Sequence, residues 1–223
     1  MRVGIVGNSH IGALKFGLEA LQDDCNHEVS LWAMPGGPFE DKVKIDGLSL
    51  SGLPKVYSSS TADGGTGEDV FVGSDYDVVV LYAQSLRLEG IGQGLKEVEK
   101  CTSGFRDAYL REISVERFAF QYAKNLTAAS VRTIIHAAPL FGEGFVSRKT
   151  FKGEATEFLR NAAASLSADF MMQPEDTISV DGKTKAEFLT GSKHLDERSR
   201  ENDFKHMNAE FGRRIMKEIL RKL

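Results

Sequence analysis

The chain has 223 residues, which suits one α/β domain with a sizeable core. A formal net charge of −4 and an isoelectric point of about 5.8 give it no electrostatic footprint for nucleic acid or for an anionic membrane surface. Because no apolar run approaches the roughly 20 residues that span a bilayer, and no secretory leader precedes the first strand, we expect a cytoplasmic protein without a membrane span.

The first half of the chain alternates between strand and helix patterns. The expected elements are a strand over residues 2–7, a helix over 10–22, a strand over 27–33 and a buried strand over 77–81. Between the last two, Asp46-Gly47 separates two short apolar stretches and predicts a two-residue β-hairpin turn, because Asp-Gly accommodates positive φ angles. We therefore expect a hairpin insertion near residues 42–57.

The second half continues the alternation after residues 87–113, whose helical pieces are interrupted by glycines. The expected elements are a helix over 114–128, a strand over 133–136, a helix over 153–168, a short strand near 170–172 and a last helix that starts after Asp203. This order predicts a single domain over residues 1–223. Its fold class is α/β, a three-layer α/β/α sandwich with a mostly parallel central sheet.

Gly7-Asn8-Ser9-His10 connects the first expected strand to the first helix. The turn places a serine hydroxyl at the C-terminal edge of the sheet, where open α/β folds bind their ligands. The Ser9 N–H points outward with the first turn of the helix, so the turn offers a nucleophile and an oxyanion donor together. Ser9 could instead serve only as the N-cap of that helix.

A second segment, from Asp203 to Asn208, is the only other place where an acid and a histidine stand together at an expected helix start. Asp203 and His206 complete a nucleophile, base and orienting-acid set with Ser9. Asp203 is also expected to cap the last helix, with His206 at its third position, and a carboxylate fixed by capping can still hold an imidazole. His194 is the rival base, although its charged surroundings are typical of solvated surface.

These two segments resemble the sequence blocks of the SGNH (GDSL-type) hydrolases. Gly7-Asn8-Ser9 is similar to the Gly-Asp-Ser block of that family, and Asp203-x-x-His206 with Asn208 is similar to its last block. The resemblance implies a flavodoxin-like fold and a triad of Ser9 as nucleophile, His206 as base and Asp203 as orienting acid. The chain departs from the family in two ways: Asn8 replaces the usual aspartate, and the Gly-x-Asn block that supplies an oxyanion donor is absent.

Other polar groups are expected at the same edge of the sheet. The oxyanion or substrate-binding candidates are Gly64 and Gly65 of a Ser/Gly-rich loop, Gln84 and Ser85 after the central strand, His10 beside the nucleophile, and His136 after a later strand. Each has a plainer alternative. Gln84 could satisfy a loop carbonyl, His10 could simply be exposed, and His136 could be a hydrogen-bonded histidine at a strand end.

No cofactor is expected. Gly7-x-x-x-x-Gly12 has the spacing of a phosphate-binding loop, but Ala13-Leu14 stands where Lys-Ser/Thr is required. Histidines and acids show no zinc spacing, and Cys25 and Cys101 show neither metal nor redox spacing, which favours free thiols.

The sequence therefore predicts a serine-dependent ester hydrolase, an esterase or deacetylase. Its expected partner is a small or carbohydrate-linked acyl ester, with no nucleic acid, and no feature predicts an oligomeric state. The alternatives are an acyltransferase that uses the same triad and a non-catalytic binding protein that keeps the cleft.

Overall fold

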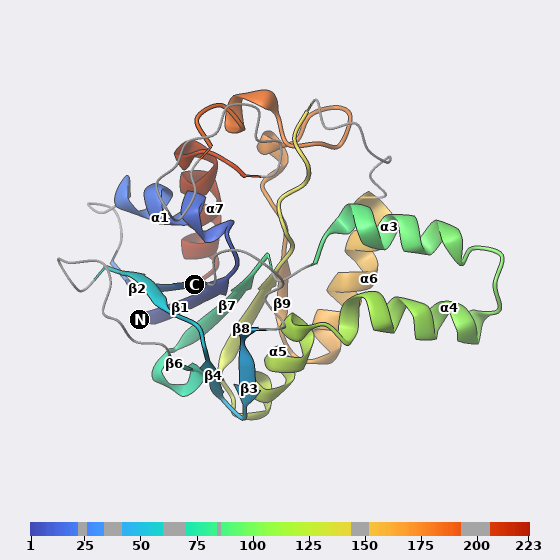
Figure 1. Cartoon of the computed structure of the whole chain (residues 1–223), viewed down its shortest axis with the longest axis horizontal. Coiled ribbons are helices and arrows are strands. Elements are labelled where there is room, and N and C mark those ends of the chain that lie inside the picture. Colours follow the sequence, from blue (N-terminus) through green and yellow to red (C-terminus); the bar gives the residue numbers. More distant parts are fainter. Residues whose placement is uncertain (22–25, 34–41, 60–69, 84–85, 144–151, 193–205) are drawn as a thin grey trace.

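The computed structural model of the chain describes residues 1–21, 26–33, 42–59, 70–83, 86–143, 152–192 and 206–223, and Figure 1 shows their arrangement. A six-stranded sheet with the order β5-β2-β1-β7-β8-β9 forms the centre. Its strands are β1 (Arg2–Gly7), β2 (Glu28–Ala33), β5 (Lys55–Ser58), β7 (Val78–Tyr82), β8 (Arg132–His136) and β9 (Asp169–Met171). All neighbouring strands are parallel except β2 and β5, so the expected mostly parallel sheet is confirmed.

The central strand β7 shows why the sheet forms. All five of its residues are buried, and it pairs with β1 on one side and β8 on the other. A run of β-branched and large apolar side chains is stable there because helices cover both faces of a parallel sheet. This is the strand that the sequence predicted most clearly, and it begins one residue later than expected.

Helices cover the sheet on both faces, which confirms the three-layer α/β/α sandwich. On one face α1 (Ile11–Glu19) and α7 (Ala209–Lys222) pack against alternate residues of the strands. The other face carries α3 (Leu88–Glu97), α4 (Ser103–Leu110), α5 (Phe118–Ala128) and α6 (Lys152–Ser165). A π-helical turn over Arg111–Val115 follows α4, so α5 begins later than the expected residue 114. Short 3₁₀ turns span Gly73–Asp75, Glu175–Thr177 and Ala186–Phe188.

The expected hairpin insertion is present but differs in its turn and its extent. Strands β3 (Lys44–Asp46), β4 (Ser49–Ser51) and β6 (Val70–Val72) form a small antiparallel sheet. Asp46 pairs with Ser49, so the two loop residues are Gly47 and Leu48 and not Asp46-Gly47. Gly47 has a φ of 56°, which suits the first loop position of a type II′ turn.

The end of the expected insertion belongs to the main sheet. Residues 55–58 form β5, which pairs antiparallel with β2 at the edge. Tyr57 explains this placement, because its ring is 6% exposed and packs into the core beneath α1 and α7. The small sheet thus consists of β3, β4 and β6, and only β3 and β4 lie within the expected hairpin.

α1 and α7 touch through their backbones. A Cβ atom added to Gly212 of α7 would lie 1.7 Å from the carbonyl oxygen of Ala13, and one added to Gly17 of α1 would lie 2.2 Å from the Arg213 nitrogen. Only glycine permits so close an approach. The crossing fixes the N-terminal end of α1 next to the segment that precedes α7. None of the helices in the described ranges is long and apolar enough to cross a membrane.

Candidate active site

The structure brings Ser9 and His206 together although 197 positions separate them. His206 Nε2 lies 2.9 Å from Ser9 Oγ. With a neutral imidazole protonated on Nδ1, the hydroxyl donates its hydrogen bond to Nε2, which is the geometry that a general base requires. The expected proximity of these two side chains is therefore observed.

The turn that carries Ser9 is held by the residues before it. A Cβ atom on Gly7 would lie 2.9 Å from the Tyr82 carbonyl oxygen, so glycine is needed where β1 ends against β7. The Asn8 amide then braces the turn on two sides: Nδ2 donates to the Ala83 carbonyl at 2.6 Å, and Oδ1 accepts from the His10 N–H at 3.1 Å. An aspartate could accept the second bond but could not donate the first. The bond to the Ala83 carbonyl therefore explains why this chain has an asparagine at position 8.

Ser9 is not used to cap α1. The N-cap position is His10, with no side-chain cap hydrogen bond, and the first helical bonds are accepted by the carbonyls of Asn8 and Ser9. In the described part of the chain the Ser9 N–H donates to no protein acceptor. A nucleophile and a backbone donor are thus both available at the sheet edge.

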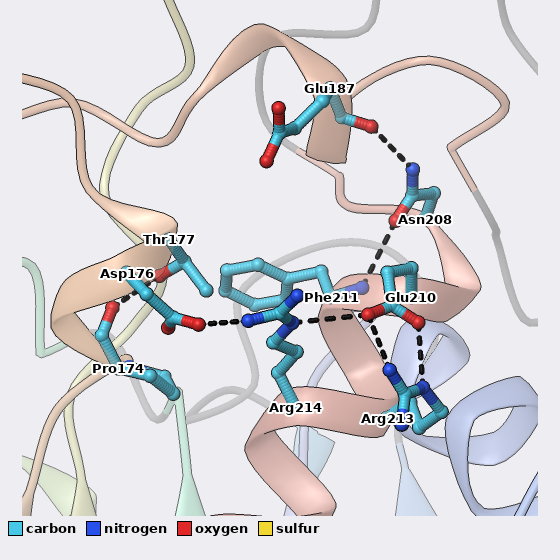
Figure 2. Close-up of polar contacts among 9 residues, drawn as sticks. All are labelled: Pro174, Asp176, Thr177, Glu187, Asn208, Glu210, Phe211, Arg213 and Arg214. Atoms are coloured by element: carbon cyan, nitrogen blue, oxygen red, sulfur yellow. Dashed lines mark hydrogen bonds and ion pairs between the residues drawn. The ribbon is translucent and has the colours of Figure 1, made fainter.

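The segment that carries His206 is anchored by Asn208. The Asn208 N–H donates to the Phe188 carbonyl at 2.8 Å, and its side-chain Nδ2 donates to the Glu187 carbonyl at 2.8 Å. Its Oδ1 accepts from the Phe211 N–H at 3.0 Å, so Asn208 is also the N-cap of α7 (Figure 2). These bonds fix the chain only two residues from the imidazole.

The N-cap assignment corrects the expected start of the last helix. α7 begins at Ala209, with Asn208 as its cap, and not directly after Asp203. His206 therefore lies in the segment before the helix and not at its third position. The sequence could not separate the two caps because Asp and Asn are equally favoured at that position.

Ion pairs link the first turns of α7 to one another, and one of them joins α7 to the segment that contains Asp176. Arg214 contacts both Glu210 of α7 and Asp176, while Arg213 donates two hydrogen bonds to Glu210 (Figure 2). The hydrogen bonds from Arg213 lower the pKa of the Glu210 carboxyl below its usual range, and Arg214 adds to the effect. All of these groups are substantially exposed, so each pair adds little by itself and the network serves mainly to orient α7.

The two other histidines at the sheet edge have different environments. The His10 ring is 6% exposed and lies 5.2 Å from the His206 ring, centroid to centroid, so it contacts the base rather than being simply exposed. His136 has no exposed surface. Its Nδ1 donates to the Ala137 carbonyl at 2.7 Å, and its ring packs 4.9 Å from Tyr82. The plainer alternative, a hydrogen-bonded histidine at a strand end, describes His136 better than substrate contact does.

Burial sets the protonation state of His136. It lowers the pKa of the imidazole to about 4, while the hydrogen bond to Ala137 acts in the opposite direction and is weaker. His136 is therefore neutral near pH 7. It therefore brings no positive charge to the layer beneath the site.

Several candidate residues lie outside the described residues. They are Asp203, His194, Gly64, Gly65, Gln84 and Ser85. Their expected roles in the triad and in the oxyanion site stay predictions. Ala83 is the described residue just before Gln84 and Ser85, and its φ is 56°. This left-handed conformation costs an alanine about 1–2 kcal/mol. Such strain is typical of functional edges, and no signal in the sequence indicates it.

Comparisons of the chain with protein-family models, with curated proteins and with solved structures give no match. The resemblance to the SGNH hydrolases therefore stays a prediction from two sequence blocks. Within the described ranges, no group of three or more His, Cys, Asp or Glu side chains is arranged to hold a metal ion.

Proposed function

We propose that the protein is a serine-dependent ester hydrolase. The observation that supports the proposal is the 2.9 Å contact between His206 Nε2 and Ser9 Oγ, at the end of β1. A serine hydroxyl in water is a weak nucleophile, and a base within hydrogen-bond reach is the usual means of activating it. The alternative that Ser9 is a helix cap loses its support, because His10 occupies the cap position.

In the proposed reaction Ser9 Oγ attacks the ester carbonyl while its proton passes to His206 Nε2. The tetrahedral intermediate collapses as the bond to the alcohol breaks, and the imidazolium returns the proton to the departing alcohol oxygen. His206 then takes a proton from a water molecule, which attacks the carbonyl of the acyl-serine. The acid is released and Ser9 is restored. Asp203 is proposed to orient the imidazole through its other nitrogen.

The oxyanion of both intermediates requires hydrogen-bond donors. The Ser9 N–H is one, since it has no described acceptor in the protein. A glycine N–H from residues 64–65 and the side chains of Gln84 or Ser85 are the proposed further donors. Losing one such donor from a working site costs about 10²–10³ in turnover, so at least one of them is needed in place of the absent asparagine.

The proposed substrate is a small or carbohydrate-linked acyl ester, which makes the enzyme an esterase or a deacetylase. The cytoplasm is the proposed compartment, because the thiol of Cys101 is free and exposed, as is usual for proteins in reducing surroundings.

Covalent labelling tests the proposal directly. A fluorophosphonate probe at pH 8 should modify Ser9 in the folded protein: Oγ displaces fluoride from phosphorus and the proton passes to His206. Ser9→Ala should abolish labelling, and His206→Gln should slow it by about 10² or more, the usual contribution of a general base.

His27→Gln is the matched control, because it removes a half-buried histidine at the start of β2 and should leave the labelling rate unchanged. Mass spectrometry of the labelled peptide identifies the serine. An unmodified Ser9 after prolonged exposure, in protein shown to be folded, would refute the hydrolase and favour a non-catalytic binding protein.

A further inference from the structure

A charged side chain extends the line of polar groups that starts at Ser9. The His10 ring lies beside the His206 ring at 5.2 Å, with 33° between their planes. The same His10 ring is in contact with Arg87, whose Nη2 lies 3.3 Å from His10 Nε2. Arginine can only donate, so Nε2 of His10 accepts and carries no proton, and His10 is neutral. The order is therefore nucleophile, base, neutral histidine and arginine.

Arg87 occupies a defined place at the C-terminal edge of the sheet. It precedes α3, in the segment that follows the central strand, and it is half-buried. Its guanidinium carbon lies 4.4 Å from the centre of the Phe141 ring, in the segment that follows β8. The aromatic face orients the guanidinium plane, and stacking of this kind favours arginine over lysine.

The hydrogen bonds that Arg87 makes are long and end on neutral acceptors. The contact with His10 measures 3.3 Å and that with the Pro139 carbonyl 3.4 Å, whereas charge-assisted bonds to carboxylates are usually about 2.7–2.9 Å. A guanidinium has about five N–H groups. In the described part of the chain it engages only these two acceptors and forms no ion pair.

The carboxylate of Glu89, whose charge acts on Arg87, is hydrogen-bonded to another segment through one of its oxygens. Glu89 is 5% exposed, and its Oε1 accepts from the Phe141 N–H at 2.7 Å. Glu89 therefore holds the residue on which Arg87 stacks, and within the described residues it forms no hydrogen bond with the guanidinium. Burial lowers the pKa of Arg87, and the charge of Glu89 opposes this with a smaller effect. A partly desolvated cation whose described hydrogen bonds all end on neutral acceptors gains most from a bidentate anion.

We propose that Arg87 determines the specificity of this site and that the natural ester carries a carboxylate, which the guanidinium binds beside His10. The inference rests on the proposed function, since it assigns the substrate of the same serine. Arg87 contacts a part of the substrate away from the reacting carbonyl, so its contribution should be to binding rather than to the chemical step.

Matched esters test the proposal. The probes are 3-carboxyphenyl and 4-carboxyphenyl acetate, each compared with its carbamoyl counterpart, which has nearly the same shape and no charge. Arg87→Met should lower kcat/KM for the better carboxylate by about 10–100-fold, mostly through KM, because a hydrogen-bonded charge contributes that much. The carbamoyl esters should be nearly unaffected.

Arg160→Met is the control, since it removes one exposed positive charge from α6, outside the contacts that join Ser9, His206, His10 and Arg87. It should leave the ratio between carboxylate and carbamoyl esters unchanged. An equal loss of kcat/KM for both esters in Arg87→Met would show that Arg87 merely braces the site. An unchanged kcat/KM for both would show that no carboxylate binds there. Either result overturns the proposal.

A variant that cannot cleave esters allows the carboxylate site to be tested separately from the proposed function, because binding is measured without turnover. Calorimetric titration with the carboxyphenyl acetates should compare Ser9→Ala with the double variant that also carries Arg87→Met. The Kd of the single variant should be about 10–100-fold lower. If the wild type cleaves no ester and Ser9 resists labelling, the hydrolase fails while the difference in Kd still supports the anion site. Equal Kd values overturn the anion site whatever the activity.

Discussion

Gly212→Ala should disrupt the contact between α1 and α7 that holds the candidate site together. The added Cβ would lie 1.7 Å from the Ala13 carbonyl oxygen, and real Cβ contacts are essentially never shorter than 3.0 Å. The two backbones must therefore move apart by at least 1.3 Å, from 1.7 to 3.0 Å. Neither side can yield by a rotamer change, because the clash is with backbone.

The expected loss of unfolding free energy is about 3 kcal/mol, the upper end of the usual cost of overpacking. A gap of about 1 Å already forfeits up to about half of the dispersion attraction across an interface. The interface includes Leu14, Leu18 and Ile215, which are all at most 1% exposed. The better helix propensity of alanine, about 0.5–1 kcal/mol, offsets only part of this loss.

Gly90→Ala in α3 is the matched control, because a Cβ atom there meets nothing within 4 Å. It should raise the unfolding free energy by about 0.5–1 kcal/mol. Urea unfolding followed by circular dichroism gives both values, and the fluorophosphonate labelling rate at zero urea gives the effect on the Ser9–His206 contact. Should Gly212→Ala prove as stable as the wild type and label at the same rate, the close crossing would not be what positions the site.

Two further substitutions test the surroundings of the site. Asn8→Asp, which restores the usual residue of the SGNH block, should destabilise the protein by about 1–3 kcal/mol and slow labelling of Ser9, because aspartate cannot donate to the Ala83 carbonyl that Asn8 Nδ2 contacts at 2.6 Å. Equal stability and labelling would mean that this bond does not brace the turn. His136→Asn should flatten the pH dependence of stability: the folded-state pKa of about 4 lies below the ordinary value of about 6.5, so the unfolded chain binds the proton first. Wild-type unfolding free energy should fall by about 2 kcal/mol more than that of the variant between pH 7 and pH 5, measured by urea unfolding at both values. An identical loss in the two proteins would assign the titration to another group.

The fold was predictable where one local pattern determines one structure. The β-branched run of β7 has no other stable place than a covered parallel strand, and Gly7 at the end of β1 with Ser9 just after it marks a tight turn. The start of α7 was not predictable, because Asp203 and Asn208 are equally good caps. What decides is a tertiary contact: the Asn208 side chain reaches the Glu187 carbonyl, which no local pattern indicates.

The candidate site shows the same division. Ser9 and His206 were identified because each stands in a recognisable block, and the turn and the cap brought them into contact. Arg87 was missed, since its place depends on the Phe141 ring and on His10, which are remote in sequence. The available signal was its position shortly after the central strand, at the edge where open α/β sheets bind ligands.

In the proposed enzyme, the distance in sequence between Ser9 and His206 has a consequence during synthesis of the chain. The ribosome adds about 5–20 residues per second, so the 197 positions from Ser9 to His206 take about 10–40 s to synthesise. Throughout that interval the nascent chain carries a serine without its base, and it cannot acylate itself on encountering esters. Once α7 has docked, a partial opening that detaches this one helix would separate His206 from Ser9 again while the sheet stays intact. The serine would then be without its proposed base. If Ser9 reacts as proposed, the rate at which a probe labels it would therefore report the docking of α7.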